Sequence, residues 1–171
     1  VKARSLASAG LSVTLAVLMV LSTAVIPQTR DGFKSYAAEF KDTSKHWAKT
    51  YIEEAVKYGF VSGYTDGTFK PDNPITRAEF TKMLNSAIGN TAETDINFPD
   101  VKSGKWYYND VQKGVAAGFI SGKSNGDFAP DAKITRQETA VMLSRIVPTS
   151  GSNATLKVYS DYKNVEYWAE T

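Results

Sequence analysis

The chain repeats a long segment of itself, and this repeat limits the possible fold more than any other feature. Residues 60–80 recur as residues 119–139, at a constant offset of 59 positions. A fixed period is typical of repeat proteins, in which each unit buries its apolar face only against its neighbours. The identical pairs are Phe60 and Phe119, Ser62 and Ser121, Gly63 and Gly122, Gly67 and Gly126, Phe69 and Phe128, Pro71 and Pro130, Asp72 and Asp131, Ile75 and Ile134, Thr76 and Thr135, Arg77 and Arg136, and Glu79 and Glu138.

The repeat extends upstream, where an aromatic residue and an aspartate precede a tryptophan. This element occurs three times, as Phe40-x-Asp42 before Trp47, Phe98-x-Asp100 before Trp106, and Tyr159-x-Asp161 before Trp168. We therefore predict one repeat over residues 38–90 and a second over 91–149. A linker and the start of a third, truncated repeat are expected over 150–171. We expect the chain to be the N-terminal piece of a longer protein.

Each complete copy has the pattern of two helices joined by a loop. Apolar residues recur at helical spacing between residues 46 and 58, and Asp66-Gly67 and Asn125-Gly126 are turn signals in the first and second repeats. A second helix is expected from Thr76 to Ile88, and its counterpart from Thr135 to Ile146. The sequence therefore predicts a mainly α fold built from repeated helix-loop-helix modules.

Residues 1–37 have the pattern of a secretory signal peptide. Basic residues precede an apolar run over 11–26, and small residues surround the expected cleavage site after Ala37. Cleavage after Ala24 or Ala38 is left open. A transmembrane anchor is the competing interpretation, but this run is short for a span and is diluted by Ser and Thr. We expect no stable membrane span after signal cleavage.

Composition excludes several classes of chemistry. The chain has no cysteine and a single histidine, His46, so thiol catalysis and cysteine metal sites are ruled out. Of its 20 basic and 18 acidic residues, four basic and one acidic lie in residues 1–37, which leaves 16 and 17. Residues 38–171 therefore have no excess of positive charge that would indicate binding to nucleic acid. Because the Asp66-Gly67 loop also lacks the calcium-ligand pattern, we expect no metal and no cofactor.

The ordered motifs resemble the S-layer homology (SLH) repeat. They are aromatic-x-Asp, Trp, Gly-Phe-[Val/Ile]-x-Gly, [Asp/Asn]-Gly-x-Phe-x-Pro and Ile-Thr-Arg-x-Glu. The resemblance implies a pseudo-threefold, mainly helical prism, with its third repeat truncated here. It also implies an exported protein of the cell wall or S-layer. Such a protein binds peptidoglycan-linked secondary cell-wall polysaccharide, often bearing ketal-linked pyruvate, and self-assembles in a surface layer.

The Thr-Arg-Ala-Glu motif of the family matches residues 76–79 fully and residues 135–138 except at Gln137. Thr76 with Glu79, and Thr135 with Glu138, also have the spacing of a capping box, which explains them structurally. Arginine beside the positive end of a helix dipole is unfavourable by about 0.3–1 kcal/mol. Arg77 and Arg136 are therefore expected to bind an anion such as a pyruvyl carboxylate. The alternative is a salt bridge to an aspartate of a neighbouring repeat.

The upstream motif supplies four further candidates. Asp42 and Asp100 precede helices, so capping or turn formation competes with ligand contact. Trp47 and Trp106 could stack on sugars, although a repeated tryptophan is more often a core residue. The candidate ligand-binding set is Thr76, Arg77, Glu79, Thr135, Arg136, Glu138, Asp42, Asp100, Trp47 and Trp106.

Three functions compete. The first is non-covalent anchoring of a surface protein to the wall, with no catalysis in the region present. The second is the anchor region of a wall-acting enzyme, a glycan hydrolase or amidase, whose catalytic domain lies further along the chain. The third is a purely structural assembly domain. Acidic residues here repeat with the scaffold, whereas paired catalytic acids converge in one cleft and need no duplication.

Overall fold

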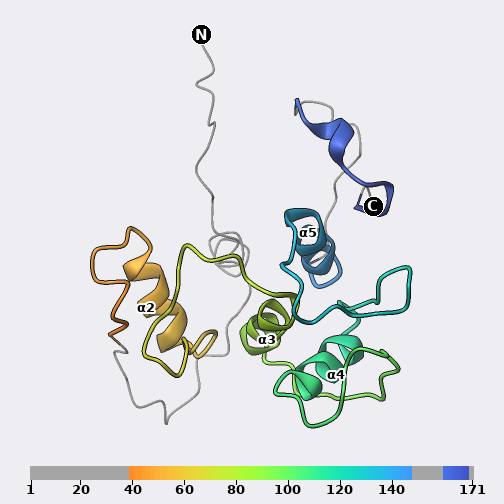
Figure 1. Cartoon of the computed structure of the whole chain (residues 1–171), viewed down its shortest axis with the longest axis horizontal. Helices are drawn as coiled ribbons and strands as arrows, with labels where there is room; N and C mark the ends of the chain where they lie inside the picture. The colour runs from red at the N-terminus through yellow and green to blue at the C-terminus, as the bar shows by residue number, and fades with distance from the viewer. Residues whose placement is uncertain (1–38, 148–159, 170–171) are drawn as a thin grey trace. The chain divides into compact units, whose positions relative to one another are not determined.

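The computed structural model describes residues 39–147 and 160–169, in which the named elements are helices joined by loops (Figure 1). The α-helices are α2 (Lys49–Lys57), α3 (Arg77–Ile88), α4 (Tyr108–Ala116) and α5 (Arg136–Ser144). Two 3-10 turns follow, η3 (Tyr162–Asn164) and η4 (Tyr167–Ala169). The predicted mainly α, repeated helix-loop-helix pattern is confirmed. The signal peptide over 1–37, its cleavage sites and the linker after residue 147 lie outside the described residues.

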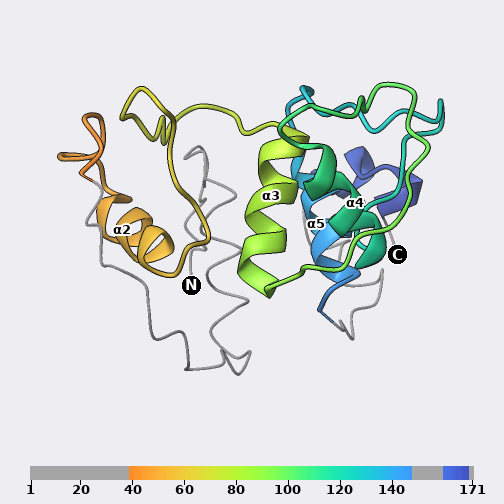
Figure 2. The same ribbon diagram turned by 90° about the horizontal axis from the view of Figure 1, so that it is seen from below.

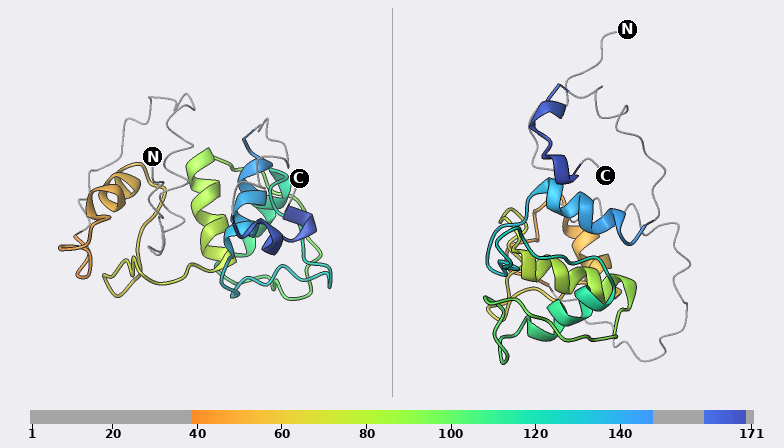
Figure 3. Two further views of the ribbon diagram at one scale, coloured as in Figure 1. Left: turned by 90° about the horizontal axis from the view of Figure 1, so that it is seen from above. Right: turned by 90° about the vertical axis from the view of Figure 1, so that its right-hand side faces the viewer.

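The described chain forms two compact units, which do not follow the sequence repeats. Unit 1 contains residues 39–57 and 62–72, and unit 2 contains 58–61, 73–147 and 160–169. Within unit 2, the second helix of the first repeat, α3, packs against the first helix of the second repeat, α4. Figures 2 and 3 show these two helices and α5 together in unit 2. The packing partner of a helix is therefore supplied by the next repeat.

Unit 1 is held together by a small aromatic core. Phe40, Ala48 and Ile52 are buried, and Phe69 packs against them with its ring centroid 5.4 Å from that of Phe40. Gly63 has a φ of 70°, and a Cβ there would overlap the Phe40 ring. Glycine is thus required at this position by both conformation and space.

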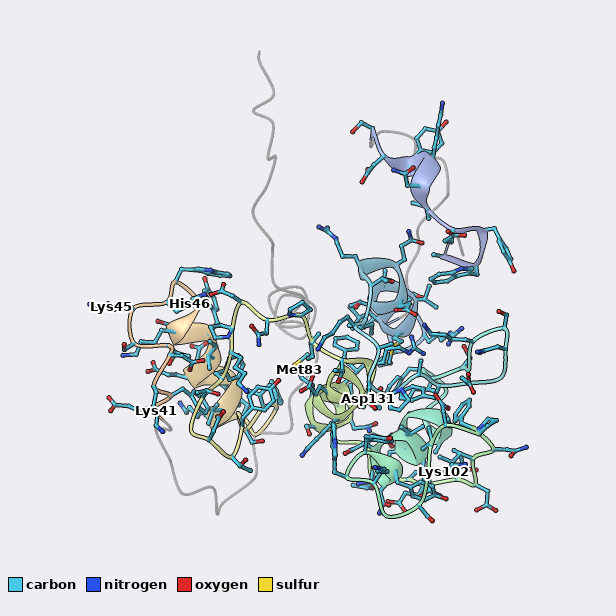
Figure 4. The ribbon with its side chains drawn as sticks, in the orientation of Figure 1. Lys41, Lys45, His46, Met83, Lys102 and Asp131 are labelled. Atoms are coloured by element: carbon cyan, nitrogen blue, oxygen red, sulfur yellow. The ribbon has the colours of Figure 1, made fainter. Side chains whose placement is uncertain are left out.

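The core of unit 2 is formed mainly by α3, α4 and the segment that follows α4. The side chains of Phe80, Leu84, Val111, Phe119 and Phe128 are fully buried. Met83 of α3, labelled in Figure 4, is also buried. The helix α3, which carries the first Thr-Arg-x-Glu motif, is therefore anchored by deep apolar packing.

Polar side chains complete the contact between α3 and α4. The buried Asn85 amide donates to the carbonyl oxygen of Asp110 at 2.8 Å. Asn90 donates to the Asn85 side-chain oxygen at 3.2 Å and to the carbonyl of Lys113 at 2.7 Å. Hydrogen bonds depend on direction as well as on distance, so these bonds fix the position of α3 against α4.

The two predicted turns have matching geometry. In the first repeat the amide of Gly67 donates to Tyr64, and that of Tyr64 to Thr68, with Gly67 at a φ of 79°. In the second repeat Gly126, at a φ of 86°, donates to Lys123. Both turn predictions are confirmed.

Candidate ligand-binding site

Both Thr-Arg-x-Glu motifs begin a helix with a capping box. Thr76 Oγ1 accepts from the Glu79 amide at 3.1 Å, and the Thr76 amide donates to Glu79 Oε2 at 2.8 Å. At α5, Thr135 and Glu138 form the equivalent bonds at 3.2 and 2.9 Å. The predicted capping boxes are confirmed, and they place both arginines at the first position of a helix.

Arg77 is buried in the junction between the two repeats. Its side chain is 7% exposed, and its guanidinium lies 2.9 Å from Glu138 Oε1 of the second repeat. Its Nε donates to the carbonyl of Phe128 at 2.8 Å, and the guanidinium lies over the Phe128 ring at 5.0 Å. The sequence left two partners open for Arg77, an anionic ligand and an aspartate of a neighbouring repeat. The structure contains a salt bridge to the neighbouring repeat, but its acidic partner is a glutamate, Glu138.

The environment of this pair shifts both pKa values. Burial lowers the pKa of Arg77, while the charges of Glu138 and Asp100 oppose that shift. For Glu138, burial raises the pKa, but the Thr135 amide and the cations Arg77 and Lys123 outweigh it, so the pKa is lowered. Lys123 Nζ lies 3.5 Å from the same Glu138 oxygen. The surroundings therefore favour the charged form of Glu138, while the ion pair with Glu138 opposes the effect of burial on Arg77.

Arg136 has a different environment although it occupies the equivalent position. It is exposed, and within residues 39–147 and 160–169 its side chain makes no ion pair or hydrogen bond. The neighbouring Gln137 donates to the carbonyl of Asn164 at 2.9 Å and accepts the amide of Glu166 at 3.0 Å. The residue at which the second motif departs from the family pattern thus contacts the start of the third copy.

Asp42 and Asp100 brace loops instead of capping helices. The Asp42 carboxylate accepts the amides of Phe69 and Lys70 at 2.9 and 2.7 Å. The Phe69 hydrogen bond is the largest cause of the lowered pKa of Asp42. The Asp100 carboxylate accepts the amides of Phe128 and Ala129 at 2.9 and 2.6 Å in the second repeat. Of the two structural roles expected for these aspartates, helix capping is wrong, because each side chain binds amides far along the chain. Turn formation is confirmed, because both residues lie in turns.

Trp47 and Trp106 are surface residues. They are 56% and 55% exposed, so the expectation that the repeated tryptophan is a core residue is wrong. Trp47 meets the exposed Tyr51 edge-on with ring centroids 6.5 Å apart, and Trp106 meets the buried Tyr107 at 5.3 Å. Lys82 Nζ lies 5.8 Å from the centre of the Trp106 ring. Each repeat therefore presents an indole held by an aromatic neighbour.

His46, labelled in Figure 4, is largely enclosed, with its side chain 14% exposed. Its Nδ1 accepts the amide of Ala48 at 3.1 Å, which leaves the ring proton on Nε2 in the neutral form. Nε2 then donates to Asp72 at 3.2 Å. The histidine braces the start of α2, which is a structural role.

Lys82 and Lys123 lie outside the shared motif positions, so the sequence did not mark them as site residues. Gln137 lies inside the motif but was noted only as a departure from it. Among the described residues, no group of three or more His, Cys, Asp or Glu side chains has the arrangement of a metal site. Within the same residues, every helix is too short or too polar to cross a bilayer.

The fold and motifs define a module of repeated helix-loop-helix units with exposed, equivalent tryptophans. The S-layer homology domain family matches residues 39–81 and 97–140, and the chain belongs to this family. The resemblance identified from the motifs is thereby confirmed.

Three relatives align with most of the chain. It is 31% identical over 158 residues to the surface-layer 125 kDa protein of Lysinibacillus sphaericus, covering 91% of this chain and 13% of that protein. It is 32% identical over 143 residues to the cellulosome-anchoring protein of Acetivibrio thermocellus, covering 80% and 32%. It is 31% identical over 169 residues to an endoglucanase of Bacillus sp. strain KSM-635, covering 95% and 18%. The chain thus spans at most about a third of these three relatives.

The family and the surface-layer relatives indicate an exported protein associated with the cell wall. The same region aligns with a surface-layer protein, a cellulosome-anchoring protein and an endoglucanase, so the region present is an anchoring domain of the S-layer homology family.

Proposed function

We propose that this chain anchors its parent protein to the bacterial wall by binding peptidoglycan-linked secondary cell-wall polysaccharide non-covalently. The observation that carries the proposal is the exposure of Trp47 and Trp106 at equivalent positions of two repeats. An exposed indole face is a surface on which a sugar ring can stack. Two equivalent sites also suit a polymer, because a polymer offers the same sugar more than once.

We further propose that the polysaccharide carries ketal-linked pyruvate and that Arg136 binds its carboxylate. Arg136 is exposed at a helix start, where unpaired amides and the dipole also favour an anion. A planar guanidinium can hold a carboxylate through two parallel hydrogen bonds, which a single ammonium cannot do.

Direct ligand contact remains a prediction for Thr76, Glu79, Thr135, Glu138, Asp42 and Asp100, whereas Arg77 is buried against Glu138 and is not proposed as a ligand contact. For these residues the protein itself already supplies hydrogen bonds or ion pairs. Arg136, Trp47 and Trp106 are the members of the candidate set that can reach a ligand without breaking a contact within the described residues. Self-assembly in a surface layer is a further expected property of the parent protein.

A second candidate is the anchor of a wall-acting enzyme, such as a glycan hydrolase or amidase. The endoglucanase relative favours it, since its match covers nearly all of this chain but only 18% of the enzyme. Both candidates assign the same wall-binding role to the residues present. They differ only in what the rest of the parent protein does.

The test is sedimentation of the full-length protein with purified wall polysaccharide from its own organism. One portion is kept native, and a second is treated with mild acid to remove ketal-linked pyruvate. Strong binding to the native polymer with weaker binding to the treated one supports the proposal. Equal binding to both removes the pyruvate assignment, and binding to neither removes the wall-glycan assignment. Release of sugars or amines from whole wall distinguishes the enzyme candidate.

A further inference from the structure

We propose that Arg77 is a positioning residue that locks the loop of the second repeat onto the start of α3, and that it does not contact the glycan. Its effect on wall binding is then exerted through the loop it holds. The binding half of this inference rests on the proposed function. The locking half concerns the protein alone.

Three donors from the start of α3 bind three alternate carbonyls of one loop. The Arg77 side chain binds Phe128 at 2.8 Å, the Arg77 amide binds Ala132 at 2.9 Å, and the Ala78 amide binds Pro130 at 3.0 Å. The first amides of a helix have no partner within the helix, so they are available for such a contact. The loop thereby occupies the anion-attracting end of α3.

Return contacts from the second repeat fix the register of this junction. The Ile134 amide donates to the carbonyl of Ile75 at 3.0 Å, and Thr76 forms an antiparallel bridge with Lys133. Phe128 is held from both sides, since its amide binds Asp100 of its own repeat and its carbonyl binds Arg77 of the preceding one. A one-residue slip would break every one of these bonds.

The charge of Arg77 is already neutralised. Glu138 contacts it at 2.9 Å in a site where both side chains are largely shielded, and the Phe128 ring covers one face of the guanidinium. A glycan carboxylate could bind here only by displacing Glu138 and opening the junction. Arg136 requires no such displacement within the described residues. The two motif arginines therefore have different roles.

The first experiment measures amide hydrogen exchange in the full-length protein. The variants are Arg77→Ala, Arg77→Lys and, as the matched control, Arg136→Ala. We expect exchange at residues 128–134 to become about tenfold faster or more in Arg77→Ala, and less so in Arg77→Lys, because charged hydrogen bonds are lost. Arg136→Ala should leave this segment unchanged. Unchanged protection in Arg77→Ala would overturn the lock. If Arg77→Ala does not fold, Arg77→Lys with and without Glu138→Gln provides the same comparison.

The second experiment compares affinities for native and pyruvate-free wall polysaccharide. A positioning role predicts that Arg77→Lys weakens binding to both polymers by the same factor, so that their affinity ratio stays that of the wild type. Arg136→Ala should reduce the ratio. A loss confined to the native polymer in Arg77→Lys would overturn the inference and make Arg77 a direct contact. If the wild type binds neither polymer, the proposed function fails, while the exchange experiment still decides the lock.

Discussion

The carboxylate of Asp100 accepts the amide hydrogen of Ala129 at an N–O distance of 2.6 Å, and Ala129 has a φ of 59°. Asp42 and Lys70 repeat this relationship at 2.7 Å, with Lys70 at a φ of 56°. These are the two non-glycine residues of the described chain in the left-handed region. In each repeat an aspartate therefore holds the loop in a conformation that an L-residue disfavours.

This relationship predicts opposite effects for two changes in the second repeat. Asp100→Ala should lower the free energy of unfolding by about 2 kcal/mol, because two amides lose a charged acceptor. Ala129→Gly should raise it by up to about 1 kcal/mol, since glycine adopts positive φ without strain. Thermal unfolding followed by circular dichroism measures both.

Ala132→Gly is the matched control, because Ala132 lies in the same loop at negative φ. It should destabilise the protein through the added freedom of the unfolded chain. If Ala129→Gly destabilises it equally, the strain assigned to Ala129 is absent.

The glycines of the two repeats should differ in their tolerance of alanine. Gly63→Ala combines left-handed strain with overlap on the Phe40 ring, whereas Gly126 has a φ of 86° with nothing near its missing Cβ. Strain costs about 1–2 kcal/mol, and overpacking adds about 1–3 kcal/mol. Urea unfolding should therefore show a larger loss for Gly63→Ala than for Gly126→Ala. Equal losses would mean that the Phe40 ring moves aside freely.

Glu138 should make stability depend on pH in the acidic range. Its pKa is lowered in the folded protein, so its contribution is present above its unfolded pKa of about 4.3 and disappears as pH falls through the folded value. Glu138→Gln removes the charge while its side-chain oxygen can still accept from Thr135. The variant should be less stable than the wild type at pH 7, and the difference should shrink between about pH 5 and pH 3. A difference that stays constant over this range would exclude the charged pair as its source.

Local sequence signals predicted the local structure well. The Thr76-x-x-Glu79 and Thr135-x-x-Glu138 spacings located the starts of α3 and α5 because a capping box involves only neighbouring residues. Asp66-Gly67 and Asn125-Gly126 located the turns for the same reason.

Long-range contacts could not be read from the chain in the same way. Arg77 meets Glu138 across 61 residues, and Asp42 binds amides 27 and 28 residues away. Because neither contact leaves a periodic signal in the sequence, helix capping, turn formation and ligand contact all stayed open for these aspartates. The tryptophans were misplaced because hydrophobicity predicts burial only on average, and Trp47 and Trp106 are more than half exposed. The pseudo-threefold arrangement and the repeat boundaries stay predictions.

The exposed tryptophans provide the last prediction. Because Trp47 and Trp106 are each more than half exposed, changing either to Ala should alter the free energy of unfolding by less than a fully buried aromatic, whose loss costs about 3–5 kcal/mol. If the rings stack on sugars, each change should weaken binding to wall polysaccharide by about two- to tenfold, and the double change by more than either single one. Replacement by Phe should retain part of the affinity, since a smaller aromatic face remains. Calorimetric titration of the full-length protein measures these affinities.

The control for the tryptophan variants is Tyr167→Ala, because Tyr167 is 82% exposed but does not occupy the repeated tryptophan position. Wild-type affinity in a folded Trp47→Ala, Trp106→Ala double variant would show that the glycan is bound elsewhere.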